Sequence, residues 1–267
     1  NGSWVALILS RLLKVPIITR TGYDILTFSI AENKNVLRRI FYYIQTYLSL
    51  RFSKIYIVSS NTDKKYLSKL FKRYSGKISV RRNWVSIPNQ NFNKKRINNL
   101  ISVGRLERQK NFDYLIKQLK NTQFSLDIVG DGSLKSKLQK SASGNRNINF
   151  HGKLDHDLLL DLLSEYSIYV SASELEGSPK SILEAMSLGC IVFTPYSSNI
   201  GEIIQHNFNG IIYKKESTDL ITELNNLIDN ELKIKKLREN SIKWITENCE
   251  IGVLSKLEFE DYSLVLK

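Results

Sequence analysis

Apolar and polar positions follow two different periods along this chain, and they predict two kinds of element. Short apolar runs are typical of buried strands, and longer stretches with apolar residues three or four apart are typical of helices. The expected strands are 15–19, 54–59, 78–80, 100–104, 124–129, 148–151, 168–171, 191–194 and 210–213. The expected helices are 4–13, 36–52, 62–72, 111–119, 133–141, 155–165, 179–188, 200–205, 217–229, 231–247 and 252–266. Their alternation predicts an α/β protein with parallel sheets.

A break in this pattern indicates where the chain divides. Residues 89–99 are polar and basic and follow a proline, so we predict a linker there. The predicted division is a first domain over residues 1–93, a second over 94–247, and a C-terminal helix, 248–267, that packs back on the first domain. A length of 267 residues is enough for two domains with real cores. Because the only methionine is Met186 and the chain begins inside a predicted helix, we interpret it as a piece of a longer protein.

The net charge of +13 is concentrated in the first part of the chain. Residues 1–97 hold 19 Lys and Arg against three acids, a net charge of +16, and the remaining residues have a net charge of −3. This asymmetry favours an anionic partner, namely nucleic acid, an anionic membrane surface or a phosphorylated acceptor, unless it reflects only a nucleotide bias. Helix 36–52 carries Arg38, Arg39 and Arg51, so it either lies on a membrane surface or, as is more common, faces a core. Its apolar stripe comprises Leu37, Ile40, Phe41, Ile44, Tyr47 and Leu48.

Cysteine and histidine usage narrows the class of protein further. The two cysteines, Cys190 and Cys249, make no disulfide framework and indicate a reducing compartment. The three histidines, His151, His156 and His206, have no metal-ligand spacing, so we assign them core or surface roles. The apolar stretch at the start of the chain is interrupted too soon for a membrane span of about 20 residues. No cleavable signal sequence is evident.

The densest candidate chemistry lies in residues 173–190, which we interpret as a loop that turns into a helix. Ser178 is a good N-cap, Pro179 suits the first helical position, and Gly189 is a good C-terminal stop. The residues expected on the buried face of this helix are Ile182, Leu183 and Met186. The first free N–H groups, near Lys180, point out of the N-terminus and are suited to hold an anion.

Two glutamates, Glu176 and Glu184, flank this anion site, with seven residues between them. A carboxylate accepts paired hydrogen bonds from vicinal hydroxyls, which ribose and hexose rings offer. A phosphate cradle with a carboxylate at either end therefore fits a nucleotide sugar. An amphipathic helix with a solvated glutamate at each end is the alternative interpretation.

A second candidate loop, Gly104–Asn111, opens the second α/β unit at the carboxyl end of its first predicted strand, the edge where ligands bind in open α/β sheets. Arg105 offers a bidentate grip on phosphate, and Lys110 adds a compact positive charge. Together they are suited to neutralise a diphosphate, although two cations in a loop are more often solvated charge.

The string Glu-Gly-x-Pro…Leu-Glu-Ala-Met-x-x-Gly over residues 176–189, with Arg105 and Lys110 about 70 residues earlier, resembles the signature of a known family. The family is that of the retaining glycosyltransferases of the GT-B fold, the large family-four group (glycosyl transferases group 1) that uses nucleotide sugars. The resemblance covers residues 98–245 well and 1–97 loosely. It implies two Rossmann-like, doubly wound parallel-sheet domains, the N-terminal one incomplete because the chain starts after the expected glycine-rich loop.

The resemblance also implies roles for individual residues. Arg105 and Lys110 would bind the donor diphosphate, Glu184 the ribose hydroxyls, and Glu176 the hydroxyls of the transferred sugar. Arg105, Lys110 and Glu176 are therefore the catalytic candidates. The other donor-binding candidates, some of them acting through backbone N–H groups or near the base, are Gly130, Lys153, Leu154, Gly177, Ser178, Lys180 and Ser181.

This chain departs from the family pattern in two places. Many members carry Phe-Gly where this chain has Ser178 and Pro179, so we expect a local change in that loop. The family's N-terminal domain carries a histidine near the sugar, and residues 20–24, which fall at that place, contain none. No catalytic side chain is assigned in the first domain for this reason.

The implied mechanism is transfer with retention at the anomeric carbon, helped by charge stabilisation and positioning and not by a strong base. Glu176 is the nominal nucleophile of a double displacement, but we favour its role as a hydroxyl binder. No metal and no cofactor is required, because Arg105 and Lys110 supply the positive charge.

We therefore predict a hexosyltransferase that moves a hexose from a nucleotide diphosphate sugar, a UDP-sugar first among them, to a hydroxyl of a lipid-linked or polysaccharide acceptor. The expected setting is surface-polysaccharide biosynthesis in the cytoplasm, peripheral at the inner face of the cell membrane. The basic first part would bind the anionic membrane surface. No nucleic-acid partner is expected, since no recognised module accompanies the charge.

Three alternatives remain open. A nucleotide-sugar epimerase of similar fold would need more acid and base residues, particularly histidine, than this chain offers. A nicotinamide-dependent dehydrogenase is disfavoured because no Gly-x-Gly-x-x-Gly follows the first strand of either unit. The third is a non-catalytic remnant that binds nucleotide sugar and lacks part of the acceptor domain. Whether the whole protein is a transferase or such a remnant, we expect this chain alone to be inactive or nearly so.

Overall fold

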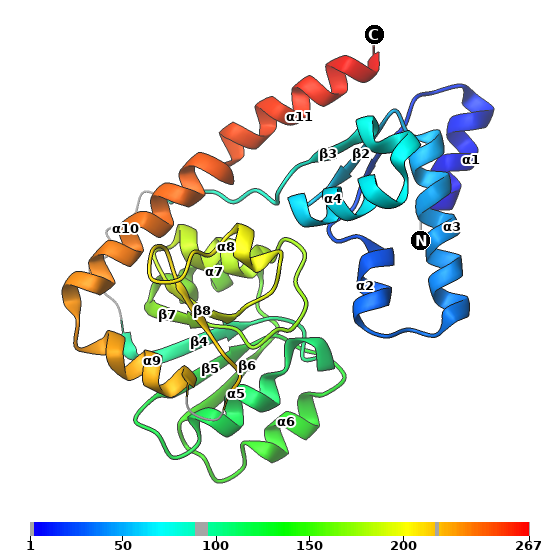
Figure 1. The fold of residues 1–267 in the computed structure, drawn as a ribbon. Coiled ribbons are helices and arrows are strands. Elements are labelled where there is room, and N and C mark those ends of the chain that lie inside the picture. The colour runs from blue at the N-terminus through cyan, green and yellow to red at the C-terminus, as the bar shows by residue number, and fades with distance from the viewer. Residues whose placement is uncertain (1–2, 89–95, 217–218, 267) are drawn as a thin grey trace. The chain divides into compact units, whose positions relative to one another are not determined.

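The computed structural model describes residues 3–88, 96–216 and 219–266 of the chain (Figure 1). They form two compact units. The first comprises residues 1–84, 176–178 and 251–267, and the second comprises residues 85–175 and 179–250. Most of the predicted linker, and the predicted domain limit between residues 93 and 94, lie outside the described residues. The last part of the linker prediction, residues 96–99, is wrong because these residues begin a strand.

The first unit is built on a three-stranded parallel sheet in the order β1-β2-β3. Its strands are β1 (Ile18–Arg20), β2 (Ile55–Val58) and β3 (Ile78–Val80). Its helices are α1 (Ser3–Leu13), α2 (Ile25–Ala31), α3 (Val36–Phe52), α4 (Asn61–Leu70) and α11 (Ile251–Leu266), with a 3-10 helix, η1, at Lys72–Lys77. The pattern did not predict α2, which has seven residues and begins after the side-chain cap supplied by Asp24.

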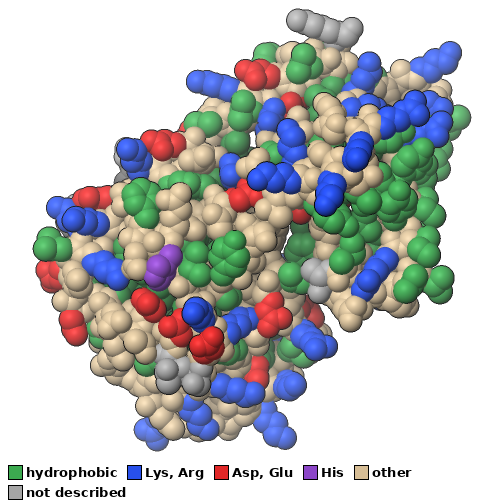
Figure 2. Space-filling model, viewed as in Figure 1, with side chains coloured by type: hydrophobic (Ala, Val, Ile, Leu, Met, Phe, Trp, Pro, Cys, Tyr) green, Lys and Arg blue, Asp and Glu red, His purple; other side chains and the backbone are tan. Residues whose placement is uncertain are grey.

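The small core of this unit is formed by Leu26, Leu50, Tyr56, Val58, Leu67, Phe71 and Ile78. Helix α3 has the predicted bounds, but most of its apolar stripe does not face this core. Leu37 is 78% exposed and Ile40 is 51% exposed, while the buried residues of the helix are Gln45, Thr46, Ser49 and Leu50. The core-facing interpretation of the stripe is therefore wrong for these residues of the described chain. Figure 2 shows apolar side chains gathered over the α1–α3 region, beside Lys and Arg side chains.

The second unit is built on a six-stranded parallel sheet in the order β6-β5-β4-β7-β8-β9. Its strands are β4 (Arg96–Val103), β5 (Ser125–Val129), β6 (Ile148–Gly152), β7 (Tyr166–Val170), β8 (Ile191–Pro195) and β9 (Ile211–Tyr213). Its helices are α5 (Phe112–Leu119), α6 (Lys135–Ser141), α7 (His156–Ser164), α8 (Lys180–Ser187), α9 (Asp219–Ile228) and α10 (Glu231–Asn248), with 3-10 turns η2 (Arg108–Lys110) and η3 (Ile200–Glu202).

Helices cover both faces of the six-stranded sheet, and each face has its own core (Figure 1). Helices α5, α6 and α9 pack on one face, α7 and α8 pack on the other, and α10 contributes to both clusters. Neighbouring residues of one strand point to opposite faces: Leu100 belongs to one cluster and Ile101 to the other. The prediction of an α/β protein with two parallel-sheet units is confirmed, and the second unit is doubly wound. Among the described helices, none is long and apolar enough to cross a membrane.

Candidate functional site

The strand order of the second unit reverses at β4 and β7. From β4 the chain moves outward to β5 and β6, and it then returns to β7 and moves outward the other way to β8 and β9. The loops that leave the carboxyl ends of two such strands diverge, and ligands bind in the crevice outside them. The loop after β4 carries Arg105 and Lys110, and the loop after β7 leads to α8, which carries Glu184. The topology brings this cationic loop and this glutamate-bearing helix to one edge of one sheet.

Glycines let three loops approach one another closely at this edge. The backbone N–H of Gly130 donates a hydrogen bond to the carbonyl of Gly152, with 2.7 Å between N and O. Gly130 has a φ of +144°, and a Cβ at this position would lie 1.9 Å from the carbonyl oxygen of Gly104. Only glycine fits there. Lys153, exposed, and Leu154, half-buried, follow Gly152 directly, so both predicted base-side residues belong to this group of loops.

The cationic loop is tied to its neighbour through an acid. Glu107 accepts hydrogen bonds from the backbone N–H (2.9 Å) and the hydroxyl (2.8 Å) of Ser133. These bonds, and to a lesser degree the charge of Arg105, lower the pKa of Glu107. The aliphatic part of Lys110 lies over the end of β4, since a Cβ on Gly104 would meet its Cδ and Cε at 3.4 Å. Arg105 itself is exposed.

Two further contacts fix the cationic loop and α8 to the same strand ends. Nε2 of Gln109 donates to the carbonyl oxygen of Leu175 at 2.6 Å, which joins the loop after β4 to the loop after β7. The hydroxyl of Tyr169 lies 3.1 Å from the carbonyl oxygen of Val103 and 3.0 Å from Oγ of Ser181. The first turn of α8 is therefore held beside the last residue of β4.

Helix α8 begins one residue later than predicted. Pro179 has extended backbone (ψ 100°) and precedes the helix, which starts at Lys180 without a side-chain cap. The prediction of Ser178 as N-cap is wrong, because its hydroxyl accepts the backbone N–H of Asn83 in the first unit. The predicted stop at Gly189 is confirmed, with a φ of +74° after the last helical turn. The buried face is also as predicted, and comprises Ile182, Leu183 and Met186.

Glu184 is buried on α8, with its side chain 7% exposed, and it has a partner that sequence reasoning missed. Its Oε1 lies 2.8 Å from Nε2 of His156, the first residue of α7, and 3.7 Å from Nζ of Lys180. A signal was present, because His156 follows the base-side residue Leu154 by two positions. The contact with Glu184 nevertheless could not be predicted from the sequence, because it depends on the packing of α7 against α8.

The centre of the glutamate motif, Glu176–Ser178, groups with the first unit, and the other eight donor-binding candidates group with the second. In the first unit Nδ2 of Asn83 donates to the carbonyl oxygen of Ser178 at 2.6 Å. A Cβ on Gly177 would lie 2.8 Å from the carbonyl oxygen of Gly22, so Gly177 is packed against the loop that follows β1. That loop, residues 20–24, is the one that falls at the place of the family's histidine and contains none.

The loop after β1 ends in a buried acid. Asp24 accepts the backbone N–H of Thr27 at 2.8 Å and caps α2. Burial raises the pKa of Asp24 to about 6, and the neighbouring charge of Asp63 acts in the same direction. The hydroxyl of Tyr56 lies 3.4 Å from its second carboxylate oxygen.

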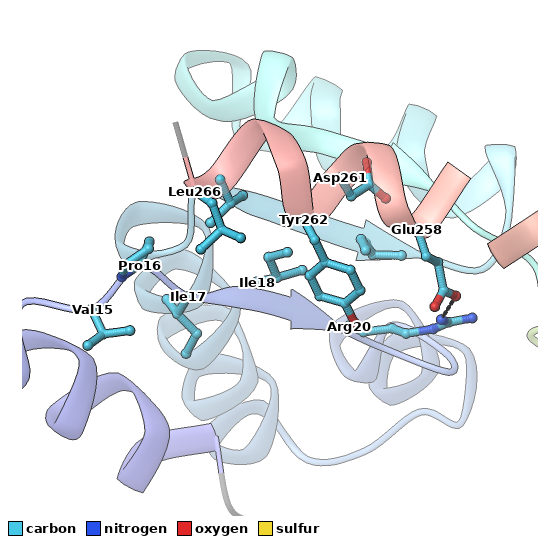
Figure 3. A pocket seen from close by; sticks show the side chains of 11 residues that line it. Val15, Pro16, Ile17, Ile18, Arg20, Glu258, Asp261, Tyr262 and Leu266 are labelled. Atoms are coloured by element: carbon cyan, nitrogen blue, oxygen red, sulfur yellow. Dashed lines mark hydrogen bonds and ion pairs between the residues drawn. The ribbon is translucent and has the colours of Figure 1, made fainter. Parts of the chain in front are cut away.

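Two surface hollows are lined by residues other than the predicted donor-binding residues. The hollow in Figure 3 belongs to the first unit, beside β1, and the ion pair of Arg20 and Glu258 lies at one end of it. Its apolar lining includes Val15, Pro16, Ile17, Ile18, Tyr262 and Leu266. No predicted donor-binding residue lines it. A hollow of the second unit, at the ends of β8 and β9, is lined in part by Glu174, Tyr196, His206 and Lys215.

Within residues 3–88, 96–216 and 219–266, no group of three or more His, Cys, Asp or Glu side chains is arranged to hold a metal ion.

Comparison with known proteins agrees with the fold described above. The sequence profile of the family described as "Glycosyl transferases group 1" matches residues 86–244. The solved structure of the Anabaena protein HepE in complex with UDP and glucose superposes with a TM-score of 0.80 at 19% identity. The match covers 98% of this chain and 75% of HepE, and it confirms the predicted GT-B architecture.

Two relatives are similar in sequence. An uncharacterised glycosyltransferase of Methanocaldococcus jannaschii is 30% identical over 158 residues, which cover 57% of this chain and 45% of the relative. The O-antigen biosynthesis glycosyltransferase WbnH of Escherichia coli is 28% identical over 244 residues, which cover 90% of this chain and 70% of the relative. The chain thus spans about half the length of the first relative and about two thirds of the second.

Proposed function

This chain belongs to the glycosyl transferases group 1 family, and on that premise we propose that it transfers a hexose from a UDP-sugar to a hydroxyl of a lipid-linked or polysaccharide acceptor, with retention at the anomeric carbon. The observation that carries the proposal is the reversal of strand order at β4 and β7. Because of this reversal, the loop that carries Arg105 and Lys110 and the helix that carries Glu184 both follow the carboxyl ends of the two strands, which supports their assignment to one ligand site. A solvated-charge interpretation would not require these three residues to converge there.

We assign the donor to the second unit as follows. The diphosphate lies between Arg105 and Lys110 and the N-terminus of α8, where Lys180 and Ser181 begin the helix and backbone N–H groups favour negative charge. Glu184 binds the ribose. Close backbone approach is possible because Gly130 has no side chain. The base lies along Lys153 and Leu154.

The chemistry assigned to this arrangement is charge stabilisation. The bond between the anomeric carbon and the diphosphate oxygen breaks, and its electron pair leaves with the diphosphate. The acceptor oxygen bonds to the anomeric carbon on the same face, and its proton passes to the departing phosphate oxygen. Arg105 and Lys110 stabilise the charge on the diphosphate in place of a metal ion. The assignment of Glu176, Gly177 and Ser178 to the hydroxyls of the transferred sugar stays a prediction from the sequence, because these three residues group with the first unit.

We further propose surface-polysaccharide biosynthesis as the setting, because the relative WbnH is named for O-antigen biosynthesis. Residues 1–93 would serve the acceptor, residues 94–247 the donor, and the helix 248–267 would belong with the acceptor side. The acceptor side carries the excess of Lys and Arg and exposes apolar side chains of α1 and α3. Both features suit peripheral binding to an anionic membrane surface at the cytoplasmic face.

Donor binding is tested by thermal unfolding and calorimetry with UDP and a panel of nucleotide sugars. At 100 times its Kd, UDP stabilises the protein by about 2.7 kcal/mol. Arg105→Ala is expected to abolish the shift and Glu184→Ala to reduce it strongly, whereas Arg108→Ala, an exposed cation of the same loop, keeps it. An unchanged melting temperature with every nucleoside diphosphate would refute the proposed site. Binding without sugar transfer to any glycan or lipid-linked acceptor would favour the non-catalytic nucleotide-sugar-binding alternative.

A further inference from the structure

Glu184 contacts a residue that lies outside the glutamate motif. Its Oε1 lies 2.8 Å from Nε2 of His156 and 3.7 Å from Nζ of Lys180. Both of these contacts end on Oε1. His156 of α7 and Lys180 of α8 therefore both hold the carboxylate through the same one of its two oxygens.

The burial of the two partners is unequal. The side chain of Glu184 is 7% exposed and that of His156 is 55% exposed. A buried carboxylate needs a hydrogen-bond donor, because it loses hydration that nothing else replaces. His156 supplies that donor from the first residue of α7, directly after the loop that carries Lys153 and Leu154. The contact thus joins the base-side loop to the carboxylate of α8.

The chemistry of a carboxylate allows this contact to persist when a sugar binds. Each carboxylate oxygen has two acceptor sites, so Oε1 is able to accept both the imidazole N–H and one ribose hydroxyl. Oε2 then accepts the vicinal hydroxyl. A glutamate has three rotatable side-chain bonds, and a fixed partner reduces the orientations that ribose must select among.

We propose that His156 is a positioning residue that holds Glu184 in the orientation that binds the ribose of the donor nucleotide. The proposal rests on the proposed function, since it takes Glu184 as the ribose ligand. It predicts that His156 affects the affinity for the two ribose hydroxyls and leaves the affinity for the base and diphosphate unchanged.

The test compares two nucleotides by calorimetry, UDP and 2′,3′-dideoxyuridine diphosphate, which lacks both ribose hydroxyls. In the full chain His156→Ala is expected to weaken UDP binding roughly three- to tenfold, the range for immobilising one flexible side chain. Binding of the dideoxy nucleotide should change less than about twofold. His156→Gln, which retains an N–H donor, should recover most of the loss. Asp157→Asn, the next residue of α7, is the matched control.

A double-mutant cycle with Glu184→Gln separates a positioning effect from a general one. If His156 acts through Glu184, adding His156→Ala to Glu184→Gln costs no further affinity for UDP. The proposal is overturned by equal losses for the two nucleotides, by unchanged or tighter UDP binding in His156→Ala, or by additive losses in the cycle. Failure of the proposed function is recognised separately, because the unaltered chain would then bind neither nucleotide.

Discussion

The two units differ in how well the apolar pattern of the sequence agrees with burial. In the second unit, alternate strand residues such as Leu100 and Ile101 enter two cores, and both are fully buried. In the first unit, α3 buries Gln45, Thr46 and Ser49 and exposes much of its apolar stripe. The apolar period therefore predicts helices correctly in both units. It predicts which face of a helix is buried only in the second unit, where helices pack on both faces of the sheet.

The two units also differ in the direction in which the pKa values of several of their acids are shifted. In the first unit, burial raises the pKa of Asp24. In the second, ion pairs or hydrogen bonds lower the pKa values of Glu107, Asp113 and Asp131. A group with a raised pKa makes the folded state bind its proton more tightly than the unfolded chain, and a group with a lowered pKa does the reverse. Through these acids alone, a rise in pH should destabilise the first unit and stabilise the second.

The largest expected effect comes from a matched pair of leucines on helices. Leu183 of α8 is fully buried, and Leu37 of α3 is 78% exposed. Leu183→Ala should lower the free energy of unfolding by about 2–5 kcal/mol, since it removes buried contacts and leaves a cavity. Leu37→Ala should change it by less than about 0.5 kcal/mol. Urea unfolding followed by far-UV circular dichroism measures both.

A large loss for Leu37→Ala would remove the contrast between the units. It would mean that something covers the exposed face of α3 in solution, so sedimentation would be measured at several protein concentrations. Leu70→Ala, at 41% exposure on α4 of the same unit, serves as the comparison for an exposed leucine outside the stripe.

The contrast also explains what sequence reasoning reached at the candidate site. The stop at Gly189 and the buried face of α8 were predictable because they depend on local backbone and on helical period. Gly130 was named through the family resemblance, and its close approach to Gly104 became known only from the pairing of β4 and β5 in the structure. The roles of the site residues of the second unit came from the family resemblance, and they stay predictions.

What could not be predicted depends on packing between distant segments. Ser178 was expected to cap a helix, but its hydroxyl accepts a hydrogen bond from the backbone N–H of Asn83, which lies 95 positions earlier. His156 was assigned a core or surface role because the histidines have no metal-ligand spacing. Its contact with Glu184 could not be predicted, since it is set by how α7 packs on α8. The burial of Asp24 depends likewise on Tyr56 and on α4, and no local pattern signals it.

The second-largest expected effect is a change in the pH dependence of stability, and it comes from the buried acid of the first unit, Asp24. Asp24 has an ordinary pKa of 3.8 that burial raises to about 6 in the folded state. Its contribution to stability is therefore fully present below pH 3.8 and is lost as the pH rises to about 6. A shift of this size corresponds to a loss on the order of 2–3 kcal/mol. Asp24→Asn, which keeps an oxygen to cap α2, should remove this part of the pH dependence.

The measurement uses a Trp244→Phe background, in which Trp4 and Trp84 of the first unit report by fluorescence. Urea unfolding at pH 4, 5, 6 and 7 gives the slope for the parent and for Asp24→Asn. Glu32→Gln changes an acid of the same unit that is paired at the surface with Lys34, and it should leave the slope unaltered. Identical slopes in the parent and Asp24→Asn would contradict the assignment.

The smallest effect is expected at the surface of the second unit, where Nζ of Lys117 lies 2.6 Å from Asp113. This pair, together with the hydroxyl of Ser141, lowers the pKa of Asp113, so its contribution is present above the ordinary pKa and lost as the pH falls below it. Because the pair is exposed and screened, Lys117→Met should cost no more than about 0.5 kcal/mol at neutral pH and low salt. The loss should vanish in about 1 M NaCl, whereas the effect of Asp24 should persist because its burial is not screened by salt. A loss at Lys117 that survives high salt would show that the helix needs the side chain for packing, and the electrostatic contrast between the units would then rest on Asp24 alone.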